Sequence, residues 1–127
     1  MKKLFLAVVF LWIATESVAQ KFTLITTIES VVPAGLGRSR MILTTSEGAK
    51  ELPMENFFSL VGINFGNIRQ NDQMITDKIT EMTKDGWDLV NTISGVYSAD
   101  KSTGIFITRY LFRKDEVKQE SENIKNE

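Results

Sequence analysis

The pattern of apolar and polar positions predicts two strands in the first half of the chain. Residues 21–30 alternate with a period of two and are rich in β-branched side chains, which is typical of a strand. Pro33 and the two glycines after it break this pattern, because proline cannot donate a hydrogen bond to a sheet and glycine tolerates positive φ. The second strand, residues 39–45, is expected to run antiparallel to the first and to end at turn-forming residues 46–48.

The second half predicts one helix and a hairpin. A helix is expected over about residues 72–85, with Asn71 as its N-cap and Gly86 as its stop signal, because its apolar residues share one face. Residues 87–97 and 105–114 are strand-like and form the predicted C-terminal hairpin. The expected fold is therefore α+β, a mostly antiparallel sheet of four or five strands with one main helix packed on one face.

Residues 53–70 form a long predicted connection that is unusually apolar. Seven large apolar side chains occur in eighteen positions, and they include Phe57, Phe58 and Phe65. Such a segment must be buried or must form an interface. A lid over the core or a further strand is one interpretation, and a dimer surface built on these phenylalanines or an apolar ligand pocket is the other.

Arg109 stands among aliphatic residues in the last predicted strand. Both faces of that strand are largely apolar, which predicts a central position in the sheet. Because an unpaired buried charge is unfavourable, we expect Arg109 to make a structural ion pair or to contact a ligand.

The composition removes most familiar enzyme chemistries. The chain has 127 residues and contains neither cysteine nor histidine. A thiolate nucleophile, a histidine general base, a Cys/His zinc site and a disulfide framework are therefore excluded. No calcium-loop motif is present either. We expect no catalytic residue, no metal and no cofactor.

The first nineteen residues are typical of an export signal. Lys2 and Lys3 precede an apolar run of eleven residues, and small residues at 17–19 suit a signal peptidase. Cleavage would leave Gln20 first. The run is shorter than a membrane span, so we expect no anchor after cleavage and a periplasmic or secreted location.

Charge divides the remaining chain in two. Residues 20–114 carry 11 basic and 10 acidic residues, whereas the tail at 115–127 is acidic and nearly devoid of apolar side chains. The tail is expected to be disordered. Nucleic-acid binding normally requires a basic excess, so it is not expected of the nearly neutral body, which should form a single domain.

The loop from Gly35 to Arg40 has the composition of an anion site. Its glycines allow backbone N–H groups to approach a ligand, and Arg38, Ser39 and Arg40 are hydrogen-bond donors for phosphate or carboxylate. No helix pattern follows, so this is neither a phosphate loop of the nucleotide-binding type nor a dinucleotide motif. A plain turn with solvated or ion-paired arginines remains the alternative.

The stretch Asp-Gly-Trp-Asp-Leu-Val at residues 85–90 follows the amphipathic helix and precedes a strand that ends in Phe112, Arg113 and Lys114. This arrangement resembles a family of small bacterial domains of unknown function over about residues 74–114, except at Asp88, where that family usually has glutamate. The resemblance implies a small sheet with one helix on its face and no catalytic residue.

These features together predict a small exported, non-catalytic binding or interaction domain of the bacterial cell envelope. Its expected partner is a second copy or another envelope protein. The alternative is an accessory domain that binds an anion or small molecule through the Gly35 to Arg40 loop, with Arg109 as a further contact.

Overall fold

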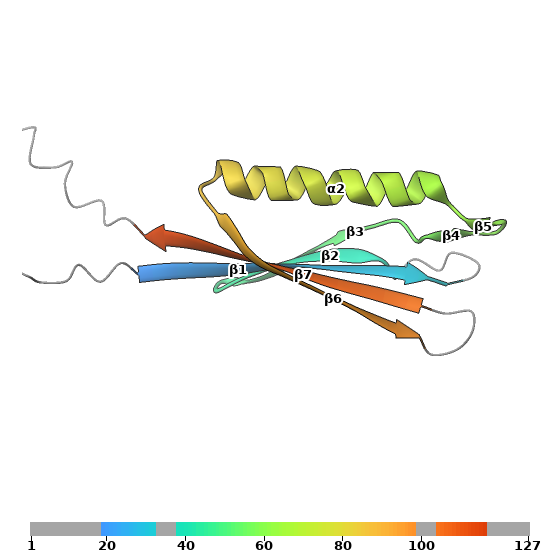
Figure 1. Ribbon diagram of the computed structural model, residues 1–127, viewed down its shortest axis with the longest axis horizontal. Coiled ribbons are helices and arrows are strands. Elements are labelled where there is room, and N and C mark those ends of the chain that lie inside the picture. The colour runs from blue at the N-terminus through green and yellow to red at the C-terminus, as the bar shows by residue number, and fades with distance from the viewer. Residues whose placement is uncertain (1–18, 33–37, 99–103, 117–127) are drawn as a thin grey trace, which may run out of the picture. The chain divides into compact units, whose positions relative to one another are not determined.

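The computed structural model describes residues 19–32, 38–98 and 104–116 (Figure 1). Among the described residues, those from 21 to 114 form one compact unit, and residues 19–20 and 115–116 belong to a second. In the second unit, exposed Gln20 donates a hydrogen bond to Asp115 at 3.1 Å. The helix is α2 (Phe65–Lys84), and the strands are β1 (Ala19–Val31), β2 (Arg40–Thr45), β3 (Gly48–Pro53), β4 (Phe58–Ser59), β5 (Gly62–Ile63), β6 (Asp88–Ser98) and β7 (Gly104–Glu116).

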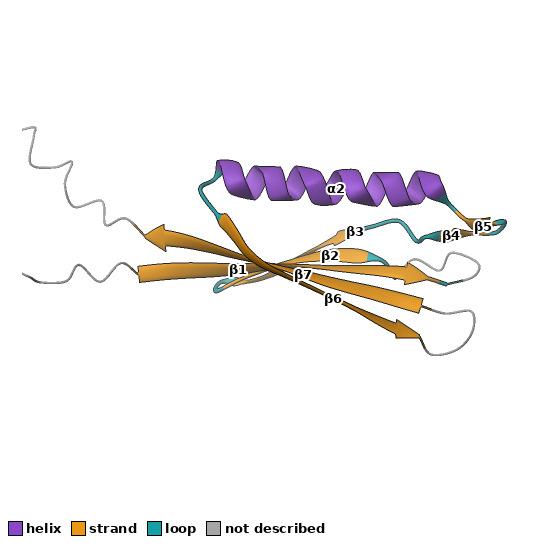
Figure 2. Cartoon of the chain, viewed as in Figure 1, coloured by secondary structure: helices purple, strands orange, loops and turns teal. Residues whose placement is uncertain are grey.

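Five of these strands form one sheet, and α2 packs against one of its faces (Figures 1 and 2). The strand order is β3-β2-β1-β7-β6, and β4 and β5 form a separate two-stranded hairpin. The pairs β1–β2, β2–β3 and β6–β7 are antiparallel. The predicted α+β fold is confirmed, and β7 has the central position expected of it.

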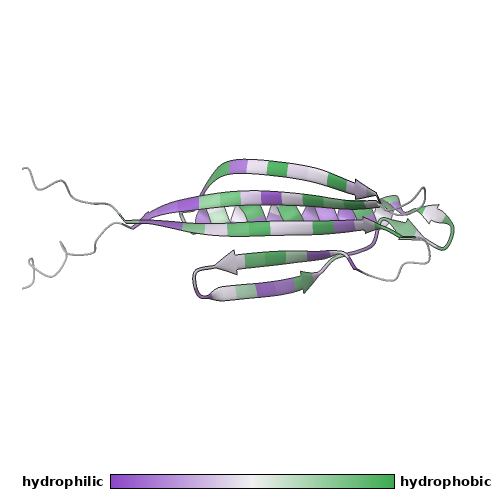
Figure 3. Cartoon of the chain, turned by 90° about the horizontal axis from the view of Figure 1, so that it is seen from below, coloured by the Kyte–Doolittle hydropathy of each residue, from purple (hydrophilic) through white to green (hydrophobic). Residues whose placement is uncertain are grey.

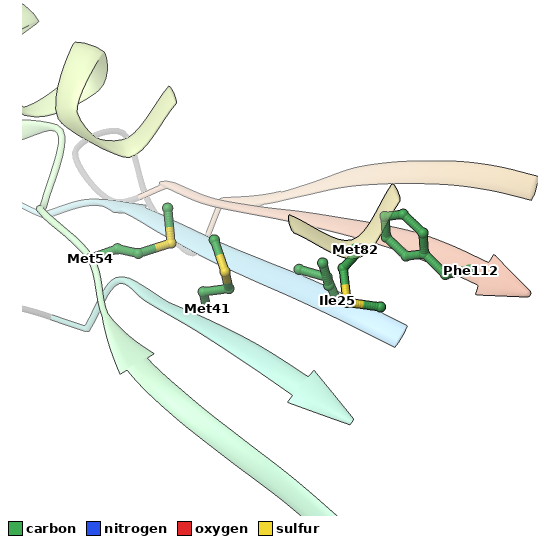
Figure 4. Close-up of a cluster of buried hydrophobic side chains, with 5 residues drawn as sticks. All are labelled: Ile25, Met41, Met54, Met82 and Phe112. Atoms are coloured by element: carbon green, nitrogen blue, oxygen red, sulfur yellow. The ribbon is translucent and has the colours of Figure 1, made fainter. Parts of the chain in front are cut away.

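The buried apolar core lies between α2 and the sheet (Figure 4). Three of its five side chains are methionines, whose flexible thioethers fill irregular space under the helix. Successive residues of a strand point to opposite faces, so the side chains that alternate with these core residues lie on the other face of the sheet. The five core residues are Ile25, Met41, Met54, Met82 and Phe112.

The predicted start of the helix was wrong. α2 begins at Phe65, and its N-cap is Asn64, whose side chain accepts hydrogen bonds from the backbone N–H groups of Gly66 and Asn67 at 2.9 and 3.2 Å. Asn71, the predicted cap, is fully buried in the second turn. Residues 65–70, read from sequence as connection, are therefore helical.

The helix ends where the sequence predicted. The residues on which the resemblance was based have structural contacts at this end of the helix. Gly86 has φ +84°, a conformation that favours glycine. The Lys114 ammonium donates to the carbonyl of Asp85 at 2.7 Å and lies 5.9 Å from the centre of the Trp87 ring. Trp87 is half-buried and packs against the core cluster, which includes the buried Phe112.

Part of the predicted C-terminal tail lies within the described structure. β7 continues to Glu116, so the first two residues of the expected tail belong to a strand. The rest of that tail, and residues 1–18 of the expected export signal, lie outside the described residues, as do residues 33–37 of the glycine-containing loop.

Candidate functional site

Four strands contribute to the sheet face opposite α2, which no other described helix or strand covers. This face, called the open face below, is most exposed along β6, whereas Thr26 on β1 is buried. Figure 3 shows this face from below, with α2 behind the strands. Residues directly opposite each other on neighbouring strands point to the same face of the sheet. The pairs Thr26–Ile42, Ile93–Arg109 and Tyr97–Ile105 therefore identify side chains that point away from α2. The larger apolar members of the face are Leu24, Ile28, Ile42, Ile93, Tyr97, Ile105, Ile107 and Leu111.

The outer strand β6 is the most exposed apolar part of this surface. Ile93 and Tyr97 on the open face are 61% and 63% exposed, and Val96 on the helix side is 67% exposed. From residue 89 to residue 97 the strand contains no charged residue and no proline. It therefore lacks the charges and proline with which proteins often protect a sheet edge from pairing.

The other sheet edge is protected. β3 carries Lys50, Glu51 and Pro53 in six residues. Glu51 accepts a hydrogen bond from the Arg40 guanidinium at 2.9 Å, and both side chains are well exposed. Charges and proline on a terminal strand oppose edge-to-edge pairing, so the two edges of this sheet differ in what they can bind.

Arg109 lies on β7 beside a shallow hollow of about 260 Å³ in the open face, lined also by Ile93, Tyr97 and Ile107. Within the described residues the guanidinium forms no ion pair, and Arg109 is exposed rather than buried. The expectation of a structural ion pair is therefore not met here. An exposed cation on an apolar surface is available to an acidic or carbonyl group of a partner.

The three described residues of the predicted anion loop have different surroundings. Arg38 is exposed, and its backbone carbonyl accepts a 3.4 Å hydrogen bond from Arg40. Arg40 is engaged by Glu51. The Ser39 side chain is buried, where its hydroxyl accepts from the backbone N–H of Ser30 at 3.0 Å. Ser39 is therefore a structural residue in this arrangement, and only Arg38 points its charge to solvent without an acidic partner among the described residues.

The three phenylalanines predicted to form an interface differ in their exposure and do not form one surface patch. Phe57 and Phe58 are half-buried, and the Phe57 ring packs against Phe106 with 5.9 Å between centroids. Phe65, at the start of α2, is 67% exposed. The most exposed apolar residues of this segment are two that sequence reasoning did not single out, Leu60 and Val61 at the tip of the β4–β5 hairpin.

Asparagines hold this segment in place, and of these only Asn71 was predicted to have a structural role, as a helix cap. Asn56 accepts from the Ser30 hydroxyl at 3.0 Å and donates to two backbone carbonyls. Asn67 donates to the carbonyl of Asn56 at 2.7 Å, and Asn71 both accepts from and donates to the backbone of Glu55. The sequence contains four asparagines within sixteen residues. Their spacing alone does not distinguish a helix cap from a buried side chain that binds the backbone of a neighbouring segment.

One ionisable pair lies between the helix and the sheet. Burial raises the pKa of Glu29, which accepts a 3.2 Å hydrogen bond from Asn71 that acts in the opposite direction, and the nearby charge of Asp72 raises it further. Burial and then the charge of Glu29 raise the pKa of Tyr110. These groups face the buried side of the sheet, away from the open face.

The described residues contain no cluster of three or more acidic, histidine or cysteine side chains that could hold a metal ion. None of the helices in the described part of the chain is both long and apolar enough to cross a membrane. Comparisons with models of protein families and with curated proteins give no match to this chain. The class that the geometry defines is thus a small α+β sheet protein with one helix-covered face and one open face.

Proposed function

We propose that this chain is a non-catalytic interaction domain of the bacterial cell envelope, and that β6 and the adjoining open face bind a protein partner. The observation that carries the proposal is the contrast between the two sheet edges. One edge carries Lys50, Glu51 and Pro53, whereas the other presents nine successive uncharged residues with three apolar side chains more than 60% exposed.

Binding of a partner chain along β6 is favourable for two physical reasons. Apolar surface contributes roughly 25 cal/mol per Å² when it leaves water, and an exposed strand edge leaves backbone N–H and C=O groups free to pair with another chain. A partner strand or loop satisfies both at once, which is the mode of binding called β-augmentation. Arg109 adds a cation next to the same strand.

A photo-cross-linking experiment in the producing bacterium tests this function. A photoreactive phenylalanine analogue replaces Tyr97 on β6 in one strain and Lys50 on exposed β3 in the other. We expect a cross-linked product of higher mass from position 97 and none from position 50, with the bound protein identified by peptide mass spectrometry. Equal products from both positions, or none from position 97, would reject β6 as the binding surface.

The envelope location has its own test. The proposal is supported by the charged start, apolar run and small residues of positions 1–19. We expect the intact mass of the protein recovered from the producing bacterium to begin at Gln20 or its cyclised form. A recovered protein that still begins at Met1 contradicts export by this signal.

Anion binding is the second candidate function, and the free charge of Arg38 is the observation that favours it. Each charge-assisted hydrogen bond contributes about 1.5 to 3 kcal/mol, so one exposed arginine supports only weak binding. We expect phosphate or sulfate to raise the melting temperature of the wild type and not of Arg38→Ala at matched ionic strength. Equal rises in both proteins would indicate a general salt effect.

A further inference from the structure

We propose that the partner of β6 is a second copy of this chain, whose own β6 pairs with it antiparallel and continues the sheet across the two copies. This inference rests on the proposed function and specifies its partner. A strand that pairs antiparallel with its own copy forms a twofold-symmetric, closed contact, which is the commonest arrangement of homodimers.

The backbone of β6 is suited to such pairing over most of its length. Its register with β7 is regular from Asn91 to Ser98, and the only irregularity is the bulge between Leu89 and Asn91. A bulge disrupts a ladder locally, so the free edge available to a partner is the regular part. Eight extended residues span about 27 Å, enough for a full ladder of backbone hydrogen bonds.

Charge is the argument for a second copy over a different protein. In a symmetric antiparallel pair, residues near the twofold axis face themselves or close neighbours of the same sequence. Any charged residue there would face a like charge, which is destabilising. β6 has no charged residue from 89 to 97, so no two like charges of these strand segments face each other when they pair.

The side chains next to the axis also allow close approach. Ser94 and Gly95 are small and lie in the middle of the regular part, flanked by Ile93 and Val96. Val96 pairs with Phe106, which is itself 37% exposed, so the helix side of the strand offers a second apolar contact. A neighbouring strand would cover part of the apolar surface on both faces.

The contact area sets the strength of this dimer. A stable interface of standard size buries about 800 Å² on each partner, and a strip one strand wide buries less than that. The dimer should therefore be weak, with a dissociation constant on the order of 10 µM.

The absence of cysteine from the chain allows a direct test on the purified protein. Single-cysteine variants at residues 91 to 97 are oxidised and analysed for disulfide-linked dimers, because a disulfide requires Cα atoms within about 7 Å of each other. We expect one maximum within β6, at the position nearest the axis, and a decline on either side. Val61→Cys at the hairpin tip, which is 96% exposed, serves as the control for random collision.

Sedimentation gives the independent measurement. We expect the wild type to dimerise reversibly, Val96→Lys to weaken the dimer at least about tenfold, and Val61→Lys to leave it unchanged, although both lysines replace a largely exposed valine. Circular dichroism confirms that each variant is folded. Ile93→Lys repeats the comparison on the open face of the same strand and should weaken the dimer as well.

The outcomes separate this inference from the proposed function. A monomer at all concentrations, or cross-linking at residue 61 that equals or exceeds that in β6, overturns self-pairing of β6. If the photo-cross-linked product from position 97 in the bacterium contains a different protein, self-pairing is overturned. The proposal that this chain is an interaction domain is then supported. Failure of both the purified and the cellular experiments rejects both proposals.

Discussion

Glu29 makes the stability of this fold depend on pH. Its carboxyl is half-buried under α2 beside Asn71, and burial raises its pKa above the ordinary value of 4.5. A raised pKa means that the folded state binds the proton more tightly than the unfolded state. The stabilising contribution of protonated Glu29 is therefore complete below pH 4.5 and is lost as the pH rises through the folded-state pKa.

Glu29→Gln removes this dependence and keeps an oxygen that can accept from Asn71. We expect the variant to be more stable than the wild type at pH 7 and to show a flatter decline of stability between pH 4.5 and pH 7. Urea unfolding at several pH values measures the difference. Parallel pH profiles of the two proteins would show that Glu29 does not titrate in this window.

Lys114 has a structural role at the end of the helix. Its ammonium contacts both the carbonyl of Asp85, at 2.7 Å, and the face of Trp87. We expect Lys114→Met, which keeps the apolar stem, to lower the free energy of unfolding by about 1 kcal/mol. Lys84→Met removes an exposed charge from the same end of α2 and should cost less than about 0.5 kcal/mol. Equal losses would indicate a general charge effect on the helix.

At the scale of elements, the asparagines explain how an apolar connection becomes ordered structure. Asn71 is fully buried, and its amide satisfies both the N–H and the carbonyl of Glu55 at 2.9 and 2.8 Å. Asn71→Ala leaves these backbone groups without their partner, so we expect a loss of about 2 kcal/mol or more in urea unfolding. Gln70→Ala, on the exposed side of the same turn, is the control and should be nearly neutral.

These contacts also show where sequence reasoning reached its limit. Period-two patterning and Gly86 correctly predicted the hairpin of β6 and β7 and the end of α2, because those signals are local. The start of α2 was missed, since both Asn64 and Asn71 are good N-cap residues and only tertiary packing buries one of them. β3 was not recognised because its exposed face carries charges and no apolar period.

The candidate site was harder to predict than the fold. Arg109 was identified, but its exposure on an open face depends on the order of the strands, which the sequence did not determine. The importance of β6 follows only from its terminal position, because the same uncharged residues in a central strand would be ordinary core. Ser39 was taken for a donor to a ligand, and its buried partner Ser30 lies nine residues earlier in the chain.

For the whole molecule, the small core means that the proposed dimer should have a measurable effect on stability. Only five apolar side chains are buried among the described residues, three of them methionines, while several others on β6 remain exposed. No disulfide compensates, because the chain has no cysteine. In the proposed dimer, a second copy covering β6 would stabilise the folded state by mass action, because only folded chains would pair.

The melting temperature should therefore depend on protein concentration. With a dissociation constant on the order of 10 µM, raising the total concentration from about 1 µM to about 100 µM adds roughly 0.9 kcal/mol, or about 4 °C for a domain of this size. Scanning calorimetry of the wild type measures this rise. Val96→Lys should lose it and Val61→Lys should keep it, because only Val96 lies on the sheet edge that is proposed to pair. A melting temperature that is constant over this range in the wild type contradicts dimerisation at this strength.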